Sequence, residues 1–378
     1  MFEGARANRN LSGATSSALH SWLETYSVSR ERNLMPIFST DLLGLIQKMN
    51  VASENEKKRH HFVPVCYLNG YIGGDGKVFA YRKDEPNSPL HVRPREIAFE
   101  RYYYSQPLPD GGRDNNTIEN FFSTIESTWP RLVERMAQRQ NIWPDREAII
   151  LFLSMLRVRV PAARDMIEAF LAAQVKARAK LLDDRGKLPP KPEELPNDFL
   201  DRVDVAIDPH QSLHAMPALI NGFAEVISRI GFEVLHNETG TSLISTDNPV
   251  IYFDPDVPEK RMLPYHVHPS LGRIELLFPI SKHLVLVGRS ELVGKRYIRH
   301  RTLSSVDDAR RMNRLVARFG YRFIFAADQT HEALVRRYAA ESPVLKAEVL
   351  PGPEGGKFVF ADHIFGARQW KPKWQAAT

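Results

Sequence analysis

The spacing of hydrophobic and polar residues predicts strands in the first third of the chain. From residue 60 to 104, short apolar runs at 65–68 and 77–81 lie on either side of the glycine-rich turn at 73–76. Apolar runs of this length around glycine and aspartate are typical of a β-hairpin. We therefore expect a strand-rich N-terminal part.

Helical spacing follows in the centre of the chain. Apolar residues recur every three or four positions over about 116–139 and again over about 144–180, which predicts two long helices. Asn116, with Glu119 three residues later, has the pattern of a capping box for the first helix. Pro161 is expected to kink the second helix.

The second half returns to strand-like spacing around two more helices. A helix is predicted over about 217–230 and a basic helix over 307–318. Short β-type runs separated by Pro, Gly, Asp or Asn are found at 232–235, 242–245, 250–253, 274–278, 283–287 and 321–325. Together these patterns predict an α+β protein with a strand-rich N-terminal part, a central helical region and a strand-rich second half packed on helices.

The length of 378 residues favours two closely packed lobes over one compact core. Residues 1–58 are interpreted as an N-terminal extension, with a helix-like stretch over 40–49. Residues 59–330 are expected to form the core, whose lobes join near 186–205 in a proline-rich connection. Residues 331–378 are interpreted as a C-terminal segment and tail.

The composition narrows the class of protein without naming a function. Hydrophobic residues at 43% and charged residues at 25% are ordinary for a globular protein. A formal charge of +6, from 51 basic and 45 acidic residues, permits nucleic acid or a nucleotide as partner but does not require either. One cysteine excludes an internal disulfide and suits the cytoplasm, and no apolar stretch is long enough for a membrane role.

The first candidate site is the pair His60 and His61, which precedes an apolar segment. In a strand the two imidazoles point to opposite faces, so one site includes both only where the chain turns. Pro64 favours such a turn and places the pair at the entrance of a strand. The alternative is that one histidine is exposed to solvent while the other caps a sheet edge.

The second candidate site is the turn at 245–249, which contains Asp247 and Asn248 between two predicted strands. Asp and Asn favour turns because their side chains bond the neighbouring backbone. A carboxylate and an amide at the end of a strand also suit a substrate or Mg²⁺. Both interpretations remain open at this stage.

Charged residues on the central helices supply further candidates. Glu119 and Glu126 are seven residues apart and flank an apolar stripe, and Arg157 and Arg164 have the same spacing on the next helix. A simple interpretation is that an arginine pairs with a glutamate across the helix contact. Alternatively, the two glutamates join Asp247 in holding a divalent cation, Mg²⁺ or Mn²⁺.

Several cofactors are not expected. No GxGxxG motif opens a helix, and no GxSxG motif is present. We therefore expect no nicotinamide, flavin or haem, and no serine nucleophile of the hydrolase type.

In order and spacing, these segments resemble a bacterial family known as domain of unknown function family 4238, roughly over residues 59–326. The matching pieces are the 60–64 histidine segment with Tyr67 and Leu68, the tyrosines ending at Tyr104, the 119–126 helix, the 159–161 segment, the 246–250 turn, the 278–281 segment and Asn313. The resemblance implies that His60, His61, Asp247 and Asn248 form a site. It brings no particular activity with it.

The residue types suit a hydrolase that cleaves a phosphodiester, a nuclease-like effector in bacterial defence or a toxin setting. One imidazole of the pair would act as general acid or base, Asp247 with Glu119 or Glu126 would hold the cation, and Arg159 would stabilise the phosphate charge. The candidate ligand-binding residues are Tyr67, Tyr104 and Asn313.

Two alternatives stay open. In the first, the histidines and the Asp247 turn bind a nucleotide or another anionic ligand without turnover. In the second, a histidine of the pair bonds Asp247 and locks the lobes together, in a structural or interaction protein. We expect the pair and the Asp247–Asn248 turn to converge on one cleft; packing of the two in a closed core would favour the structural lock instead.

Overall fold

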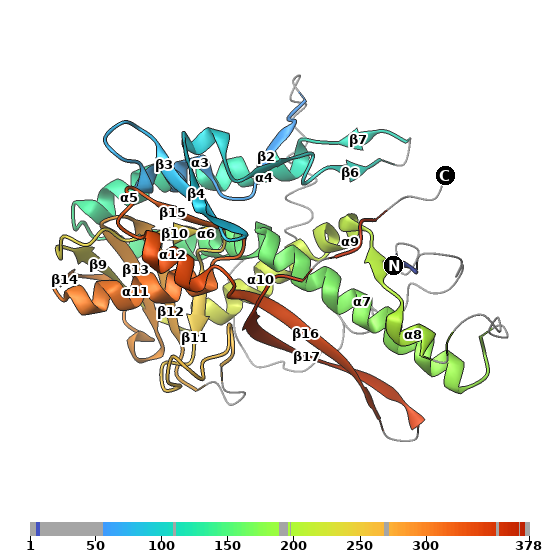
Figure 1. The fold of residues 1–378 in the computed structure, drawn as a ribbon. Coiled ribbons are helices and arrows are strands. Elements are labelled where there is room, and N and C mark those ends of the chain that lie inside the picture. The colour runs from blue at the N-terminus through green and yellow to red at the C-terminus, as the bar shows by residue number, and fades with distance from the viewer. Residues whose placement is uncertain are drawn as a thin grey trace.

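The computed structural model describes residues 5–7, 56–108, 111–188, 196, 198–267, 272–352, 355–369 and 371–374 (Figure 1). These ranges contain a run of strands, a run of helices and then further strands with helices between them, which confirms the predicted α+β class. The helices are α3 (Val65–Leu68), α4 (Thr117–Glu126), α5 (Trp129–Ala137), α6 (Arg146–Arg159), α7 (Pro161–Asp184), α8 (Phe199–Arg202), α9 (Pro209–His214), α10 (Met216–Ser228), α11 (Val306–Phe319) and α12 (Glu332–Tyr338). The strands are β1 (Ala5–Ala7), β2 (Arg59–His61), β3 (Val78–Arg82), β4 (Glu85–Val92), β5 (Phe99–Arg101), β6 (Gln106–Pro107), β7 (Arg113–Asp114), β8 (Val205–Ile207), β9 (Gly231–Asn237), β10 (Ser245–Thr246), β11 (Ile251–Phe253), β12 (Glu275–Ser281), β13 (Leu284–Arg289), β14 (Arg299–Leu303), β15 (Phe323–Ala326), β16 (Ser342–Pro351) and β17 (Lys357–Gly366).

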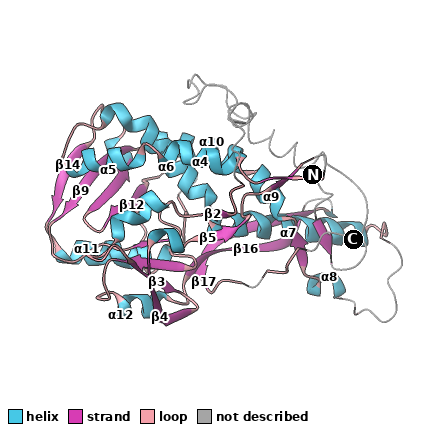
Figure 2. Ribbon diagram, turned by 90° about the horizontal axis from the view of Figure 1, so that it is seen from above, coloured by secondary structure: helices cyan, strands magenta, loops and turns pink. Residues whose placement is uncertain are grey.

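The largest sheet has five strands in the order β11-β12-β13-β9-β14, all antiparallel except β14, which runs parallel to β9. On one face, Trp129 of α5 stacks on Phe152 of α6 with ring centroids 3.9 Å apart, and its ring lies 5.7 Å from Phe278 of β12. On the other face, α11 places Leu315 beside the same cavity as Leu277. Helices therefore cover both faces of this sheet (Figure 2).

A second, four-stranded sheet has the order β10-β15-β3-β4 and is antiparallel throughout. Tyr67 of α3 connects the two sheets, because its hydroxyl lies 2.6 Å from Ser245 Oγ of β10 and donates to the Pro279 carbonyl of β12 at 2.7 Å. The sheets are thus fixed to each other by a buried hydrogen bond.

A buried lysine fixes the second sheet to the C-terminal half of the chain. Lys83, which follows β3, donates from Nζ to the carbonyls of Ala317 at 3.1 Å and Gly320 at 2.9 Å, and to that of Glu341. The first two carbonyls belong to the end of α11, where a cation is favourable for the helix dipole.

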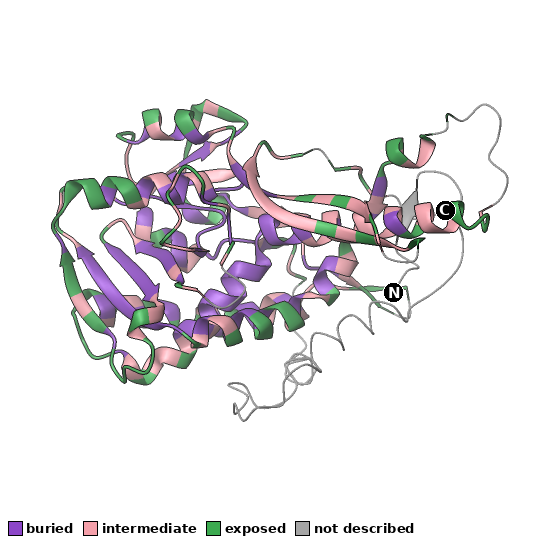
Figure 3. Cartoon of the chain, turned by 90° about the horizontal axis from the view of Figure 1, so that it is seen from below, coloured by how far each residue is buried: buried purple, intermediate pink, exposed green. Residues whose placement is uncertain are grey.

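One hydrophobic cluster of buried residues extends from Phe62 to Val344. Ten of the 14 residues of α6 are buried, and this helix runs through the centre of the cluster (Figure 3). Described residues before and after the predicted 186–205 connection therefore share one core. The division into lobes stays a prediction.

The C-terminal region forms a long hairpin. Strands β16 and β17 pair over ten residues each, pack against α7 and extend away from the rest of the molecule (Figure 1). Phe358 and Phe360 lie on the outer face and are 47% and 52% exposed. The interpretation of 331–378 as a segment and tail did not foresee this hairpin or α12.

In the N-terminal part, the strand predicted at 65–68 and its hairpin with 77–81 were wrong, whereas the strand at 77–81 is present as β3. Residues 65–68 form helix α3, because the Pro64 carbonyl accepts hydrogen bonds from the N–H groups of Tyr67 and Leu68 at 3.1 Å each. The turn at 73–76 is present, with Gly73 N donating to Lys77 O at 2.7 Å, but the hairpin is formed by β3 and β4 further along.

Both long central helices are divided. The first ends at Glu126, and α5 begins anew with Pro130 in its first turn; the second is interrupted at Val160, where Pro161 starts α7. Proline cannot donate the hydrogen bond that a helix interior needs, so it is suited to a first turn. The capping box predicted at Asn116 and Glu119 was wrong: Asn116 stands at the N-cap of α4 without a side-chain capping hydrogen bond, and Asp114 accepts from the backbone N–H groups of residues 116 and 117 instead.

Some predictions lie outside the described residues, among them the helix at 40–49 and most of the proline-rich connection. None of the helices in the described ranges combines the length and apolar character that crossing a membrane requires.

The aromatic cluster on the large sheet predicts a strong effect of one substitution. Phe278→Ala should lower the free energy of unfolding by about 3–5 kcal/mol, because Phe278 is fully buried against Trp129 and Tyr67. Urea unfolding followed by circular dichroism measures this. The control Phe358→Ala removes an equal volume from an exposed side chain and should change stability by no more than about 0.5 kcal/mol. Equal losses in both variants would contradict the role assigned to Phe278.

Candidate functional site

His60 is completely buried in β2 and both of its ring nitrogens have backbone partners. Nδ1 accepts the N–H of Tyr104 at 2.8 Å, so the proton resides on Nε2, which donates to the Lys57 carbonyl at 2.9 Å. Burial lowers the pKa of the imidazole. The ring is therefore neutral, and its two hydrogen bonds join β2 to the backbone at Tyr104 and at Lys57.

His61 faces a different environment, as strand alternation predicts. It is half-buried, its Nε2 lies 3.3 Å from the Arg95 carbonyl, and its ring is 5.4 Å from that of Phe99. Burial lowers its pKa as well. The two histidines thus occupy separate places.

Arg159 lies at the end of α6 and is completely buried. Its guanidinium forms an ion pair with Glu126, donates to the His61 carbonyl and lies 4.3 Å above the ring of Phe122. Its Nε donates to the Tyr104 hydroxyl at 3.3 Å. A buried charge with these partners holds α4, α6 and β2 together.

The predicted helix-to-helix ion pair is present, but the arginine differs. Arg157 lies 3.9 Å above the ring of Tyr265, and Arg164 donates to the carbonyl of Tyr103 at 2.6 Å. Arg159, at the last position of α6, makes the contact with Glu126 instead. The expectation for Arg157 or Arg164 was therefore wrong.

Glu119 lies beside the same group on α4. Burial raises the pKa of its carboxyl, which the nearby Arg159 counteracts, and one oxygen, Oε2, has no hydrogen-bond partner among the described residues. Across those ranges no group of three or more His, Cys, Asp or Glu side chains is arranged to hold a metal ion. The divalent cation at Asp247, Glu119 and Glu126 remains a prediction.

Asp247 is completely buried at the end of β10. Its Oδ1 accepts the backbone N–H groups of Tyr321, Arg322 and Phe323 at 2.9, 3.0 and 3.1 Å, and Oδ2 accepts that of Arg322 at 2.9 Å. Burial raises the pKa of this carboxyl although the N–H groups favour the charged form. Asp247 therefore fixes the segment that leads into β15.

Asn248 fixes the end of α11, which precedes residues 321–323. Its Nδ2 donates to the Phe319 carbonyl at 2.7 Å and to the Tyr265 hydroxyl at 2.5 Å, while Oδ1 has no partner in the described part of the chain. The 245–249 turn thus bonds the chain after α11 as well as its own backbone.

The remaining candidates follow the same division. Asn313 accepts the N–H of Ile244 at 3.1 Å and donates to the Ser242 carbonyl at 2.9 Å, so it belongs with the Asp247 turn. Tyr67 also contacts this part through Ser245. Tyr104 belongs with the histidines. We call the residues around Arg159 the histidine group, which comprises His60, His61, Tyr104, Glu119, Glu126 and Arg159. We call the residues around β10 the turn group, which comprises Tyr67, Asp247, Asn248 and Asn313.

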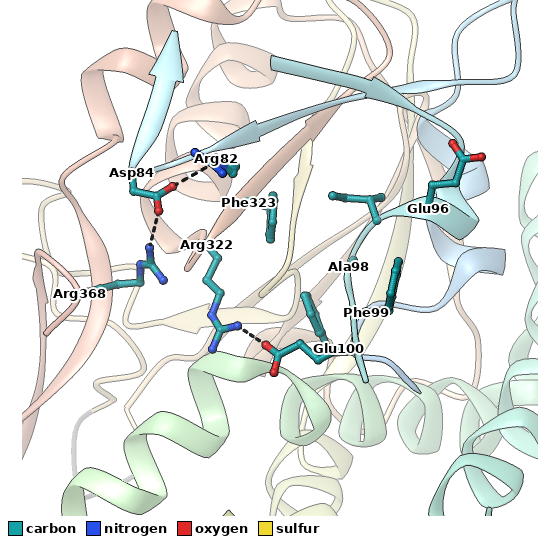
Figure 4. A pocket seen from close by; sticks show the side chains of 11 residues that line it. Arg82, Asp84, Glu96, Ala98, Phe99, Glu100, Arg322, Phe323 and Arg368 are labelled. Atoms are coloured by element: carbon teal, nitrogen blue, oxygen red, sulfur yellow. Dashed lines mark hydrogen bonds and ion pairs between the residues drawn. The ribbon is translucent and has the colours of Figure 1, made fainter. Parts of the chain in front are cut away.

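A surface cavity of about 350 Å³ lies where segments of the two groups meet. Phe62 and β5 border it from the histidine side, and Arg322 with Phe323 border it from the turn side (Figure 4). The full lining is Phe62, Arg82, Asp84, Glu96, Ile97, Ala98, Phe99, Glu100, Arg322, Phe323 and Arg368. The residues of the histidine group and the turn group thus do not line the cavity themselves, but they hold the segments that do.

Charges line one part of the cavity. Arg322 forms an ion pair with Glu100, and Asp84 lies between Arg82 at 3.6 Å and Arg368 at 3.7 Å (Figure 4). The latter two contacts are long and partly exposed, so solvent weakens them. Arg82 also forms an ion pair with Glu85, so Arg368 is the guanidinium that depends on the loosely held Asp84.

The backbone of the cavity wall is strained at Ala98, which has a φ of 57° although it is not glycine. Its carbonyl accepts the N–H of Phe62 at 2.9 Å and that of Val63 at 3.4 Å, which holds the unusual conformation in place. Strain of this kind costs about 1–3 kcal/mol and is concentrated at functional sites.

Sequence reasoning did not single out the residues that face the cavity. Arg82, Arg322 and Arg368 are far apart in the chain and belong to no short motif. One sequence signal pointed to the cavity: Phe62, which lines it, directly follows the histidine pair. Only the antiparallel pairing of β3 with β15 brings Arg82 opposite Phe323.

The partners of His60 predict a loss of stability on truncation. His60→Ala should lower the free energy of unfolding at pH 7.5 by about 1–3 kcal/mol, because the N–H of Tyr104 and the carbonyl of Lys57 lose their partner. Chemical denaturation of the full chain measures the change. His214→Ala, at an exposed position, is the control and should be neutral. A neutral result for His60→Ala would refute the assigned role.

The lowered pKa of His60 also predicts a pH dependence. Below the ordinary value of 6.5 the unfolded chain binds a proton that the folded state resists, so stability is complete above pH 6.5 and decreases as the pH falls below it. The same sign holds for His363, whose pKa burial lowers to about 4. Unfolding midpoints from pH 7.5 to 5 should therefore fall less steeply in His60→Ala than in the parent chain. Parallel curves would contradict this.

Comparison with known proteins places the chain in a family. The family described as "Protein of unknown function (DUF4238)" matches residues 59–330, which include the histidine group, the turn group and the whole cavity lining except Arg368. No curated protein and no solved structure matches the chain. The resemblance inferred over 59–326 is thereby confirmed: the chain belongs to the DUF4238 family.

Proposed function

We propose that the cavity between β5 and the Arg322–Phe323 segment binds a nucleotide-like ligand, an anion that carries a planar ring. The observation that supports this is the presence of guanidinium and aromatic side chains in one cavity of about 350 Å³. That volume lies in the range of small-ligand sites, which begins at roughly 300 Å³. The strained wall at Ala98 adds to the case.

The charged part suits a phosphate. Arg368 is held only loosely by Asp84, so a phosphate can take the place of that carboxylate on its guanidinium, whereas Arg82 also forms an ion pair with Glu85. Arg322 is more firmly engaged, by Glu100 and at 3.6 Å by Asp165. It serves to shape the site.

The aromatic part suits a planar ring. Phe99 and Phe323 line the cavity beside the charged groups (Figure 4). Phenyl rings stack on planar rings of a ligand in offset or edge-to-face geometry, and such pairs add about 0.5–1.5 kcal/mol beyond area burial. A ligand with both a phosphate and a base uses both parts at once.

Phosphodiester cleavage, in defence or a toxin setting, stays a prediction that a nuclease assay on the full chain can test. The proposal of binding is preferred because the ring nitrogens of His60 and the oxygens of Asp247 are engaged by the backbone. An acid–base catalyst needs a group within reach of the substrate. His61, which is half-buried, is the candidate with the greater access.

The proposed partner is therefore a nucleotide, and the proposed location is the cytoplasm, which the free cysteine Cys66 suits. Nucleic acid as a partner draws support from a different surface, on β14 and α11.

Calorimetric titration with adenosine 5′-monophosphate tests the proposal. The full chain should bind it more tightly than either inorganic phosphate or adenosine, because each of these uses only part of the cavity. Arg368→Gln should weaken binding of the monophosphate about tenfold or more, since it removes a charged hydrogen bond worth roughly 1.5–3 kcal/mol.

The matched control is Arg185→Gln, which removes the same charge at an exposed position beyond the end of α7. It should leave the affinity unchanged. Absence of binding to the monophosphate, or equal affinity of the Arg368→Gln variant and the parent, would reject the proposal.

A further inference from the structure

The excess positive charge of the chain is concentrated in one segment. Residues 289–319 contain nine arginines and lysines and three acidic residues, an excess of six. The formal charge of the whole chain is also +6, so the rest of the sequence is balanced. This segment comprises the end of β13, the loop to β14, β14 itself and α11.

The fold places five of these cations on one exposed edge. β14 is the last strand of the five-stranded sheet, and α11 follows it after two residues (Figures 1 and 2). Lys295 and Arg296 precede the strand and are exposed, as are Arg299 and Arg301 on it. Arg311 is exposed on α11. We call this surface the basic edge.

A cavity of about 260 Å³ lies between β14 and α11. Arg301 reaches it from the strand and Arg311 from the helix, and the hydroxyl-bearing residues Thr302, Ser304 and Ser305 line it between them. Guanidinium groups and hydroxyls are the side chains that most often contact nucleic acid phosphates.

A buried carboxylate holds the arginines of the basic edge in place. Glu233 of β9 has no exposed surface, and it contacts Arg289, Arg299 at 2.9 Å and Arg301 at 3.6 Å. One negative charge thus positions three guanidinium groups, two of which remain about half exposed, at 45% and 53%. The basic edge keeps a net positive charge, and the side chains of Arg299 and Arg301 lose conformational freedom through their contacts with Glu233.

An exposed aromatic ring lies within the basic edge. Tyr297, between Arg296 and Arg299 in sequence, is 49% exposed. Positive charge on an edge strand protects a sheet from pairing with other chains, which accounts for Arg299 and Arg301. It does not account for Lys295 and Arg296 ahead of the strand, or for the exposed ring.

From these observations we propose that the basic edge binds single-stranded nucleic acid. The cations neutralise backbone phosphates, and Tyr297 stacks on an unpaired base, which is the combination that sequence-independent single-strand binders use. This surface is separate from the cavity between β5 and Arg322, so the inference does not depend on the proposed nucleotide site.

Fluorescence anisotropy with a labelled 20-residue oligothymidylate tests the proposal on the full chain. The double variant Lys295→Gln with Arg296→Gln should weaken binding at least tenfold. It should also reduce the slope of log affinity against log salt by about 1.4, because each phosphate contact on a single strand contributes about 0.7. Tyr297→Ala should weaken binding about fivefold or more, in keeping with roughly 1–3 kcal/mol per stacked base.

The matched control is Arg185→Gln with Lys187→Gln, which likewise removes one arginine and one lysine charge, two positions apart, from an exposed site beyond α7. It should leave the affinity unchanged. The variants of the basic edge should retain the parent melting temperature and the parent affinity for adenosine 5′-monophosphate.

Three results would overturn the inference. The first is absence of oligothymidylate binding at about 50 mM salt. The second is an equal loss of affinity in the control variant. The third is binding to a duplex of the same length that is as tight as binding to the single strand and insensitive to Tyr297→Ala. Binding of phosphatidylserine vesicles through Lys295 and Arg296, without binding of the oligonucleotide, would likewise replace nucleic acid with a membrane surface.

Discussion

A buried carboxylate must find hydrogen-bond donors within the protein, and the position of Asp247 is set by that requirement. Three successive backbone N–H groups, those of residues 321–323, provide the donors. The same contact fixes the direction in which the chain leaves α11 and enters β15. Through β15 it determines where Phe323 and Arg322 stand, and with them one wall of the cavity.

Arg159 has the corresponding role on the other wall. Its guanidinium is satisfied by Glu126 and by the carbonyl of His61, so the strand that carries the histidines is held against α4 and α6. Charged groups in these positions are costly unless every partner is present, and here the partners come from separate elements. Residues that carried the resemblance, such as His60, Arg159 and Asp247, are thus internal supports of a cavity that other side chains line.

The sequence was sufficient for the class of fold and for most helices and strands of the second half, because their apolar spacing is regular. The spacing of apolar residues failed to predict helix α3. The Pro64 carbonyl accepts the first hydrogen bonds of this helix, although the residues that follow favour a strand. The pairs of specific polar residues were recognisable, but their roles were not, because partners such as Tyr104 N–H and Tyr321 N–H are backbone groups that any residue supplies. The arginines that line the cavity could not be grouped in advance, since only the pairing of β3 with β15 brings Arg82 opposite Phe323 and so near Arg322.

The long reach of the buried clamps has a consequence for the order of folding. Tyr67 bonds residues 178 and 212 positions away, and Lys83 bonds carbonyls 234 to 258 positions away. Contacts of such separation form late and slow the search for the native state. During synthesis, β3 can pair with β4 at once, but its other edge, which pairs with β15, keeps unpaired polar groups until the last quarter of the chain has emerged, and such an open edge favours association in that interval.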